Sequence, residues 1–171
     1  MSPAELKKPI LTHVQSLLHP LRYRRVGSVF SRKCQDIVQL IEVQSSRNNN
    51  DFEARFTINI GIFAPRVVYE DVRDTTKPSI SAGHWSWRLG SLSPEKKDIW
   101  WAVSTSTQAE AAAQDICSRL ALYGLPALAA VPNLLALVEI WKSGEGPGLT
   151  QYQRKDYLGR VTTVKGTHSV C

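Results

Sequence analysis

The stretch FEARFTINIGIF, residues 52–63, decides the fold of this chain. Its apolar side chains fall on every second position: Phe52, Ala54, Phe56, Ile58, Ile60 and Ile62. Strict alternation over this length is typical of an antiparallel strand with one buried face, whereas a helix would spread these residues around its axis. We therefore predict that Phe56, Ile58 and Ile60 are buried, and that Arg55 and Thr57 are much less so.

A second strand precedes this one, and the two are expected to form a hairpin. The segment 37–44 is rich in Ile and Val, and the polar segment 45–51 is typical of a turn. Pairing Glu42 with Arg55 and Ile41 with Phe56 sets opposite charges across from each other and matches the apolar faces. This register leaves Gln39 on the apolar face.

The remaining pattern indicates helices at both ends and short strands between them. Leu6, Ile10, Val14 and Leu17 form one stripe of a helix over residues 3–18, which Ser2 can cap. Further short strands are expected at 29–30, 66–69, 84–89 and 99–103. A helix is expected to begin at a Thr107–Glu110 capping box and to end at Gly124, and shorter helices follow at 126–131 and 133–141.

These elements predict an α+β fold: an N-terminal helix, an antiparallel meander of about four to six strands, and C-terminal helices packed on one face. Residues 1–143 would form a single domain. Residues 144–171 would form a polar, basic C-terminal appendage, in which 152–158 and 160–164 can pair as a hairpin about Gly159.

The composition fits one ordinary globular domain. The chain has 171 residues and 19.1 kDa, with 43% apolar and 21% charged residues, which excludes global disorder, collagen and coiled coil. The net charge is +6 and the pI about 9.4, and residues 1–88 hold 13 basic against 8 acidic side chains. This balance favours acidic partners or nucleic acid, although it is also within the range of soluble proteins.

Cysteine usage and the apolar runs favour the cytoplasm. The three cysteines are far apart and form no C-x-x-C pair, which suits a reducing compartment better than a disulfide framework. The N-terminus has no apolar core typical of a signal peptide. Residues 120–138 lack charge over 19 positions, but Pro126 and Pro132 favour two short buried helices over a membrane span.

Patterns that carry catalysis or metal binding are missing from the sequence. The histidines at 13, 19, 84 and 168 are scattered, and neither a G-x-S-x-G nor a phosphate-binding loop occurs. We expect no catalytic residue, no metal and no cofactor, and we lean against an enzyme.

Two surfaces remain as candidate binding sites. The first is the polar face of the sheet, where Gln44, Arg55, Thr57 and Asn59 would lie together, with Arg88 nearby and Trp101 as an outward anchor. Guanidinium and amide groups on a rigid sheet can hold a carboxylate or a peptide edge, and exposed Trp and Arg are enriched at interface hot spots. The alternative is an internal network that satisfies neighbouring backbone groups.

The second surface is a basic run between residues 22 and 33. It combines five cations with two aromatic residues: Arg22, Arg24, Arg25, Arg32 and Lys33, with Tyr23 and Phe30. Cations neutralise phosphates and aromatic rings stack on bases, so this run is the best nucleic-acid signal in the chain. The alternative is a solvated connection whose Arg stems cover apolar surface.

The chain also resembles a known family. The resemblance rests on LHPLRYRRVG at 18–27, Phe30, QSS at 44–46, FTINIG at 56–61, RLG at 88–90, the Trp100–Trp101 pair and Leu-Pro at 125–126. This ordered set resembles the bacterial domain of unknown function 4304 family over roughly residues 5–140, with Tyr23 and Val26 as departures from its pattern. The resemblance implies a bacterial α+β domain and supplies no activity.

Taken together, these features predict a non-catalytic bacterial module that binds another protein in the cytoplasm. An immunity- or antitoxin-like role is suggested only by analogy with other small bacterial α+β proteins. The alternative is a nucleic-acid-binding accessory module acting through residues 22–33. A third is an unrecognised enzyme using Arg55, Asn59 and Arg88. The sequence leaves the partner and the oligomeric state open.

Overall fold

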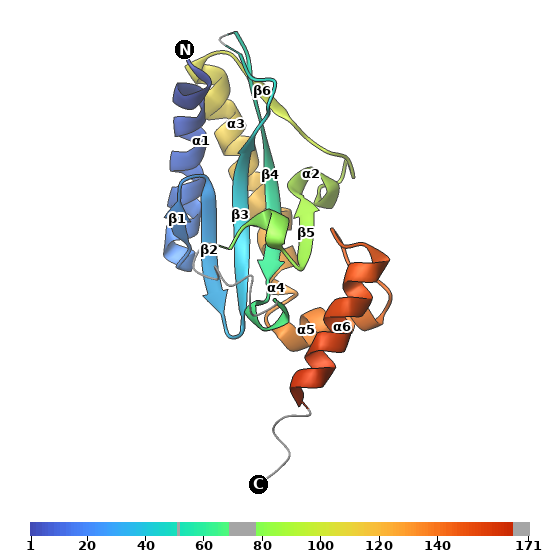
Figure 1. Cartoon of the computed structure of the whole chain (residues 1–171). Coiled ribbons are helices and arrows are strands. Elements are labelled where there is room, and N and C mark those ends of the chain that lie inside the picture. Colours follow the sequence, from blue (N-terminus) through green and yellow to red (C-terminus); the bar gives the residue numbers. More distant parts are fainter. Residues whose placement is uncertain (51, 69–77, 166–171) are drawn as a thin grey trace.

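The computed structural model describes residues 1–50, 52–68 and 78–165. Figure 1 shows a twisted antiparallel sheet with long helices against one face and further helices at one end. The helices and helical turns are α1 (Pro3–Leu18), η1 (His19–Leu21), η2 (Pro65–Val67), η4 (Ile80–Ala82), α2 (Leu89–Leu92), α3 (Ser106–Arg119), η5 (Leu120–Gly124), α4 (Leu125–Ala129), α5 (Leu134–Lys142) and α6 (Gln151–Lys165). The strands are β1 (Arg24–Val26), β2 (Val29–Cys34), β3 (Ile37–Ser45), β4 (Ala54–Phe63), β5 (Trp85–Arg88) and β6 (Trp101–Val103).

The sheet is a meander that follows the chain. Its order is β1-β2-β3-β4-β5, every pair is antiparallel, and β6 joins β4 on the same edge as β5. β5 pairs with residues 59–62 of β4, and β6 pairs with residues 54–56. The predicted α+β fold is therefore confirmed.

One face of the sheet carries the core. Helices α1 and α3 pack against each other across this face (Figure 1). Phe56, Ile58 and Ile60 are fully buried, as predicted, beneath residues of α1 such as Ile10 and Val14. Burial of each such side chain contributes about 1.5–3 kcal/mol, so this alternating strand is the main source of hydrophobic stabilisation in the sheet.

The predicted register of the hairpin is wrong by four residues. Ile41 pairs with Ile60 and Glu42 with Asn59, where Phe56 and Arg55 were expected. The expected register would place Phe63 opposite Cys34, beyond the start of β3. The observed one pairs Phe63 with Val38 and so uses the full apolar length of both strands. Because a shift of four is even, every side chain keeps its predicted face.

Two residues of the deciding stretch differ from expectation. Phe52 precedes the strand and is 86% exposed, and the Asn50 side chain accepts hydrogen bonds from the backbone N–H groups of Phe52 and Glu53. Thr57 is only 1% exposed, so its predicted exposure is wrong. It lies on a central strand beside the longer Gln44, which covers a short side chain.

Helix α3 also differs at both ends. It begins at Ser106, because the Thr105 side chain accepts the Gln108 N–H, so Thr107 is not the cap. It does not end at Gly124, because the chain continues through the π-helical turn η5 into α4. A Cβ on Gly124 would approach Leu89 at 3.2 Å, so glycine serves close packing there and does not terminate the helix.

The expected strand at 66–69 and the C-terminal hairpin are wrong. Residues 65–67 form the helical turn η2, and Tyr69 lies outside the described residues. The C-terminal segment forms the single helix α6, which Thr150 and Gln153 cap reciprocally. Its apolar residues Tyr157, Leu158 and Val161 pack against the core. The division into residues 1–143 and an appendage from 144 stays a prediction.

Among the described residues, no single helix has both the length and the apolar composition needed to cross a membrane. The segments 106–129 and 134–142 meet those criteria only together, and they are bent by 86° at the break between them.

Candidate functional site

The structure brings together part of the predicted polar face of the sheet. The Asn59 amide, in the middle of β4, donates to Glu42 at 2.9 Å and to Gln44 at 2.8 Å. Arg88 of β5 is the direct partner of Asn59 on the other side. Glu42, Asn59 and Arg88 therefore form one row across three strands, and Gln44 reaches Asn59 from a position two residues further along β3.

Arg88 is held by the segment that leads into β6. Its guanidinium carbon lies 5.2 Å from the centre of the Trp100 ring, and its Nε lies 3.9 Å from a carboxylate oxygen of Asp98. The Trp100 ring nitrogen donates to the same carboxylate at 3.0 Å, so the three side chains hold each other. One terminal nitrogen of Arg88 is buried and has no hydrogen-bond partner among the described residues.

Arg55 stands apart from this row. It lies near the start of β4, is exposed, and pairs with Glu53 at 2.6 Å. Both side chains are largely in solvent, so such a pair contributes little to stability. The structure does not join Arg55 to Asn59 or Arg88.

The expectation that Trp101 faces outward is wrong. Trp101 pairs with Phe56 on the core face of the sheet, is 9% exposed, and donates its ring N–H to Asp115 of α3 at 2.7 Å. Arg119 in turn binds Asp115 at 2.9 Å, which fixes that carboxylate over the indole. Consecutive residues of an extended chain point to opposite faces, so Trp100 takes the outer position when Trp101 faces the core.

The hydrogen bonds of Asn59 and the burial of Trp101 favour the internal-network interpretation of this face. The Asn59 amide nitrogen donates to Glu42 and Gln44, and the predicted anchor, Trp101, lies beneath α3. Binding by Gln44, Arg55, Asn59, Arg88 and Trp101 stays a prediction.

The basic run divides into two groups, because alternate residues of a strand point to opposite faces. Arg25 and Arg32 point to the helix side and are used internally. Arg32 lies 4.8 Å from the Tyr23 ring centre and donates to Gln39 at 2.8 Å, and Arg25 donates to Gln15 at 2.9 Å. Tyr23 and Phe30, the aromatic residues of the run, are 5% and 1% exposed. They are core residues and are not available to stack on bases.

Arg22, Arg24 and Lys33 form the second group. All three are exposed, and their side chains form no hydrogen bond or ion pair with a described residue. Arg24 and Lys33 share the outer face of β1 and β2, and Arg22 sits in a left-handed conformation (φ 65°) at the end of η1. Together they border an open groove of about 790 Å³, which we call the basic groove.

Apolar residues complete the walls of the basic groove. Leu21, Val38 and Pro78 line it, and Ser31 adds a hydroxyl group. The cations were visible in the sequence but these walls were not, because only the folded chain brings Val38 of β3 and Pro78 beside the cations. The charge pattern alone could not have shown them.

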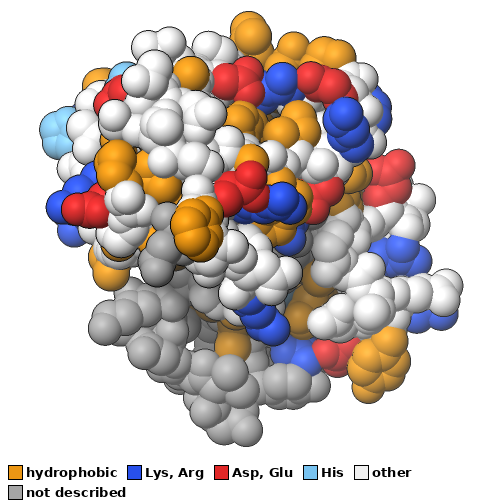
Figure 2. Space-filling view, turned by 90° about the horizontal axis from the view of Figure 1, so that it is seen from above, with side chains coloured by type: hydrophobic (Ala, Val, Ile, Leu, Met, Phe, Trp, Pro, Cys, Tyr) orange, Lys and Arg blue, Asp and Glu red, His pale blue; other side chains and the backbone are white. Residues whose placement is uncertain are grey.

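Elsewhere on the surface, charges of both signs are mixed. Figure 2 views the end where the chain begins and shows acidic and basic side chains beside one another on that face. Arg119, for example, binds both carboxylate oxygens of Glu95 at 2.9 Å, and this contact lowers the pKa of Glu95 to about 2. The basic groove differs in that its cations have no acidic neighbour of this kind among the described residues.

Within the described ranges, no group of three or more His, Cys, Asp or Glu side chains could hold a metal ion. His84 is buried between Phe63 and Tyr157, and its Nδ1 accepts the Ala64 N–H at 3.0 Å. This histidine is a structural residue of the core.

Comparison with known proteins assigns the chain to a family and to no function. No curated protein and no solved structure matches the chain. A family model described as "Domain of unknown function (DUF4304)" matches residues 14–130, which span α1 to α4 and so include the whole sheet. The chain therefore belongs to the DUF4304 family, whose function the family description leaves open.

Proposed function

We propose that this domain is a non-catalytic module that binds an acidic segment of a partner protein in the basic groove. The observation that carries the proposal is the state of Arg22, Arg24 and Lys33. They are three exposed cations around one groove, with no ionic partner among the described residues. Internally paired arginines such as Arg32 have a structural role, but the side chains of these three make no such contact with a described residue.

The chemistry of the groove favours a peptide over bare phosphate. Leu21, Val38 and Pro78 give it apolar walls, and Ser31 gives it a hydrogen-bonding group. A peptide with Asp or Glu beside aliphatic residues can pair its carboxylates with the arginines and lay its hydrocarbon on these walls. An immunity- or antitoxin-like role would be one form of such binding.

The nucleic-acid alternative has less support. Stacking platforms for bases require exposed aromatic side chains, and both aromatic residues of the run are buried. Three phosphate contacts would remain, which predicts weak binding with a salt slope of about three.

The test is a comparison of two triple variants with the same change in charge. Arg22→Gln, Arg24→Gln and Lys33→Gln together remove the groove cations. Lys8→Gln, Arg47→Gln and Lys97→Gln together remove exposed cations elsewhere. The parent and both variants are used to capture partners from the native host, and each partner's affinity is then measured with the purified protein.

We expect the groove variant to lose at least tenfold in affinity for an acidic partner, and the control variant to keep its affinity within about twofold. Equal loss in both variants would show that net charge alone drives binding. A partner bound equally well by all three proteins would place the site elsewhere. Tight binding of a single-stranded oligonucleotide, lost only in the groove variant, would favour the nucleic-acid alternative.

A further inference from the structure

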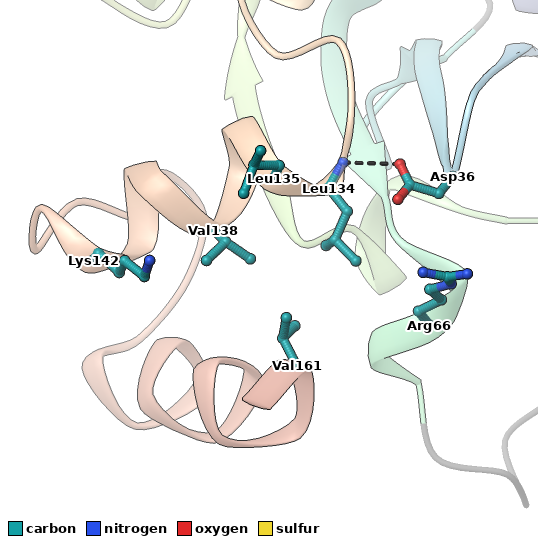
Figure 3. Close-up of a pocket in the computed structure, with 7 residues that line it drawn as sticks. All are labelled: Asp36, Arg66, Leu134, Leu135, Val138, Lys142 and Val161. Carbon is teal, nitrogen blue, oxygen red and sulfur yellow. Dashed lines mark hydrogen bonds between the residues drawn. The ribbon is translucent and has the colours of Figure 1, made fainter. Parts of the chain in front are cut away.

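A second, smaller cavity lies between helices α5 and α6, away from the basic groove. It has a volume of about 190 Å³ and is lined by Asp36, Arg66, Leu134, Leu135, Val138, Lys142 and Val161. Figure 3 shows Leu134 and Val138 on α5 facing Val161 on α6 across the space, with Asp36 and Arg66 at one end and Lys142 at the other. Four separate segments of the chain therefore meet around it.

The size of the cavity selects a small ligand. One water molecule takes about 30 Å³ in the liquid, so the space corresponds to roughly six waters. Pockets for drug-sized molecules are larger, at about 300–1,000 Å³. The walls that α5 and α6 contribute are aliphatic, and water has few hydrogen-bonding partners on them. A short hydrocarbon chain fits both the volume and the walls.

The charges at the ends of the cavity select the head group. Arg66 is exposed and has no hydrogen bond or ion pair with a described residue. Lys142, at the other end, already pairs with Glu139 at 2.8 Å. Asp36, the one carboxylate among the described lining residues, accepts the Leu134 N–H at 2.9 Å and so caps the start of α5. The guanidinium of Arg66 is therefore the charge left for a ligand, and it offers two parallel donors to a carboxylate.

From this geometry we infer that the cavity binds a small branched aliphatic carboxylate. Its hydrocarbon chain lies between Leu134, Val138 and Val161, and its carboxylate pairs with Arg66. This site is independent of the basic groove, and its existence does not depend on the proposed partner protein.

The probe is 4-methylpentanoate, which has eight non-hydrogen atoms, titrated into the full chain and followed by amide NMR shifts. We expect saturable shifts at residues 134–138 and 158–161. Shortening the acid to 2-methylpropanoate removes two methylenes and should weaken binding about fifteenfold, at about fourfold each. The neutral alcohol 4-methylpentan-1-ol should bind the parent protein about three- to tenfold more weakly than the acid does. The Arg66→Gln variant should bind the acid more weakly by the same factor. The effect is no larger because an exposed charge pair is screened by solvent.

Arg47→Gln is the matched control, since Arg47 is an exposed arginine in the loop between β3 and β4 and should leave binding unchanged. Val161→Phe fills the cavity and should abolish the saturable shifts while the remaining spectrum stays folded. If Val161→Phe unfolds the chain, the affinity of Arg66→Gln for the acid, compared with that of the parent, still tests the inference. Unsaturable shifts at all acid concentrations would overturn the inference, and so would equal binding of the acid and the alcohol.

Discussion

Gln39 is the residue at which the apolar face of the sheet is interrupted. It is 1% exposed, and its side-chain oxygen accepts hydrogen bonds from the Tyr23 hydroxyl at 2.9 Å and from Arg32 at 2.8 Å. Its amide nitrogen donates to the Leu128 carbonyl at 2.8 Å. One amide thus connects β2, β3, α4 and the segment after α1. Burial also raises the pKa of Tyr23 to about 12, so its hydroxyl remains a hydrogen-bond donor even in moderately alkaline solution.

Replacing Gln39 with leucine should destabilise the protein by about 2–4 kcal/mol, because the Tyr23 hydroxyl and the Arg32 guanidinium would lose their shared acceptor and the Leu128 carbonyl would keep only the Val131 N–H. The measurement is the free energy of unfolding from urea titration. Gln15→Leu is the control. Gln15 also accepts a hydrogen bond from an arginine, but at the surface. Removing this hydrogen bond should change the free energy of unfolding by about 0.5 kcal/mol or less. Equal stability of Gln39→Leu and the parent would mean that the network is not needed.

His84 makes stability depend on pH. Burial, with a smaller contribution from Arg160, lowers its pKa to about 4, from 6.5 when exposed. The unfolded chain therefore binds more protons between pH 6.5 and pH 4, and the free energy of unfolding falls as the pH falls through that window. We expect a loss of roughly 2 kcal/mol between pH 7.5 and pH 5 from this residue.

The control for His84 is the variant His84→Asn. Its side-chain oxygen can still accept the Ala64 N–H, but the residue does not titrate. The variant should be less stable at pH 7.5, because the contacts of the ring are lost, and its stability should change less between pH 7.5 and pH 5. A parent and variant with the same pH dependence would show that other groups cause it.

At the scale of elements, alternation within a strand was readable from the sequence, but pairing between strands was not. The faces of Phe56, Ile58 and Ile60 follow from a period of two. The register depends instead on how much apolar length both strands can pair, and the charge pair Glu42–Arg55 is too weak to decide it. Helix α6 was missed because its apolar residues are few. The reciprocal cap of Thr150 and Gln153 was the signal that could have found it.

The segment between α5 and α6 depends on a glycine. Gly148 has a φ of 79°, and a Cβ there would meet the Ser86 hydroxyl oxygen of β5. The neighbouring Pro147 carbonyl accepts the Ser86 N–H at 3.0 Å, so this segment covers the free edge of β5. The sequence pattern GEGPG suggested only a linker.

Gly148→Ala should therefore loosen the segment and α6, at a cost of about 2–3 kcal/mol from backbone strain and overlap together. Gly144→Ala is the matched control. Gly144 also has a positive φ (95°), but a Cβ added there would meet no described atom within 4 Å. The Gly144→Ala variant should lose only about 1 kcal/mol of stability. Hydrogen exchange of the Ser86 amide reports the difference directly. Equal protection of Ser86 in both variants would show that strain, and not contact with β5, sets the effect.

At the scale of the whole molecule, the fold class followed from the sequence because it depends on patterns within single elements. The candidate sites did not, because they depend on which segments meet. Arg22, Arg24 and Lys33 were visible as cations, but only the folded chain shows that Arg25 and Arg32 are used internally. Trp101 was expected at the surface because nothing in the sequence shows that α3 covers it. The cavity in Figure 3 joins residues as far apart as Asp36 and Val161.

The predicted domain boundary at residue 143 separates α6 from the rest of the fold. Helix α6 covers His84, with ring centres of Tyr157 and His84 4.8 Å apart, and Arg160 of α6 donates to the Val67 carbonyl at 2.7 Å. The family match ends at residue 130, and α6 packs mainly on α5 and η2. We therefore expect a fragment of residues 1–143 to fold with lower stability than the full chain.

The fragment should also respond differently to pH. Water would reach His84 in this fragment and Arg160 would be absent, so the pKa of His84 should rise toward 6.5. The loss of stability between pH 7.5 and pH 5 should then be smaller than in the full chain. Urea unfolding of both proteins at the two pH values measures this. An unfolded fragment would make α6 an integral part of the domain, whereas a folded fragment with unchanged pH dependence would show that α6 is not what keeps His84 neutral.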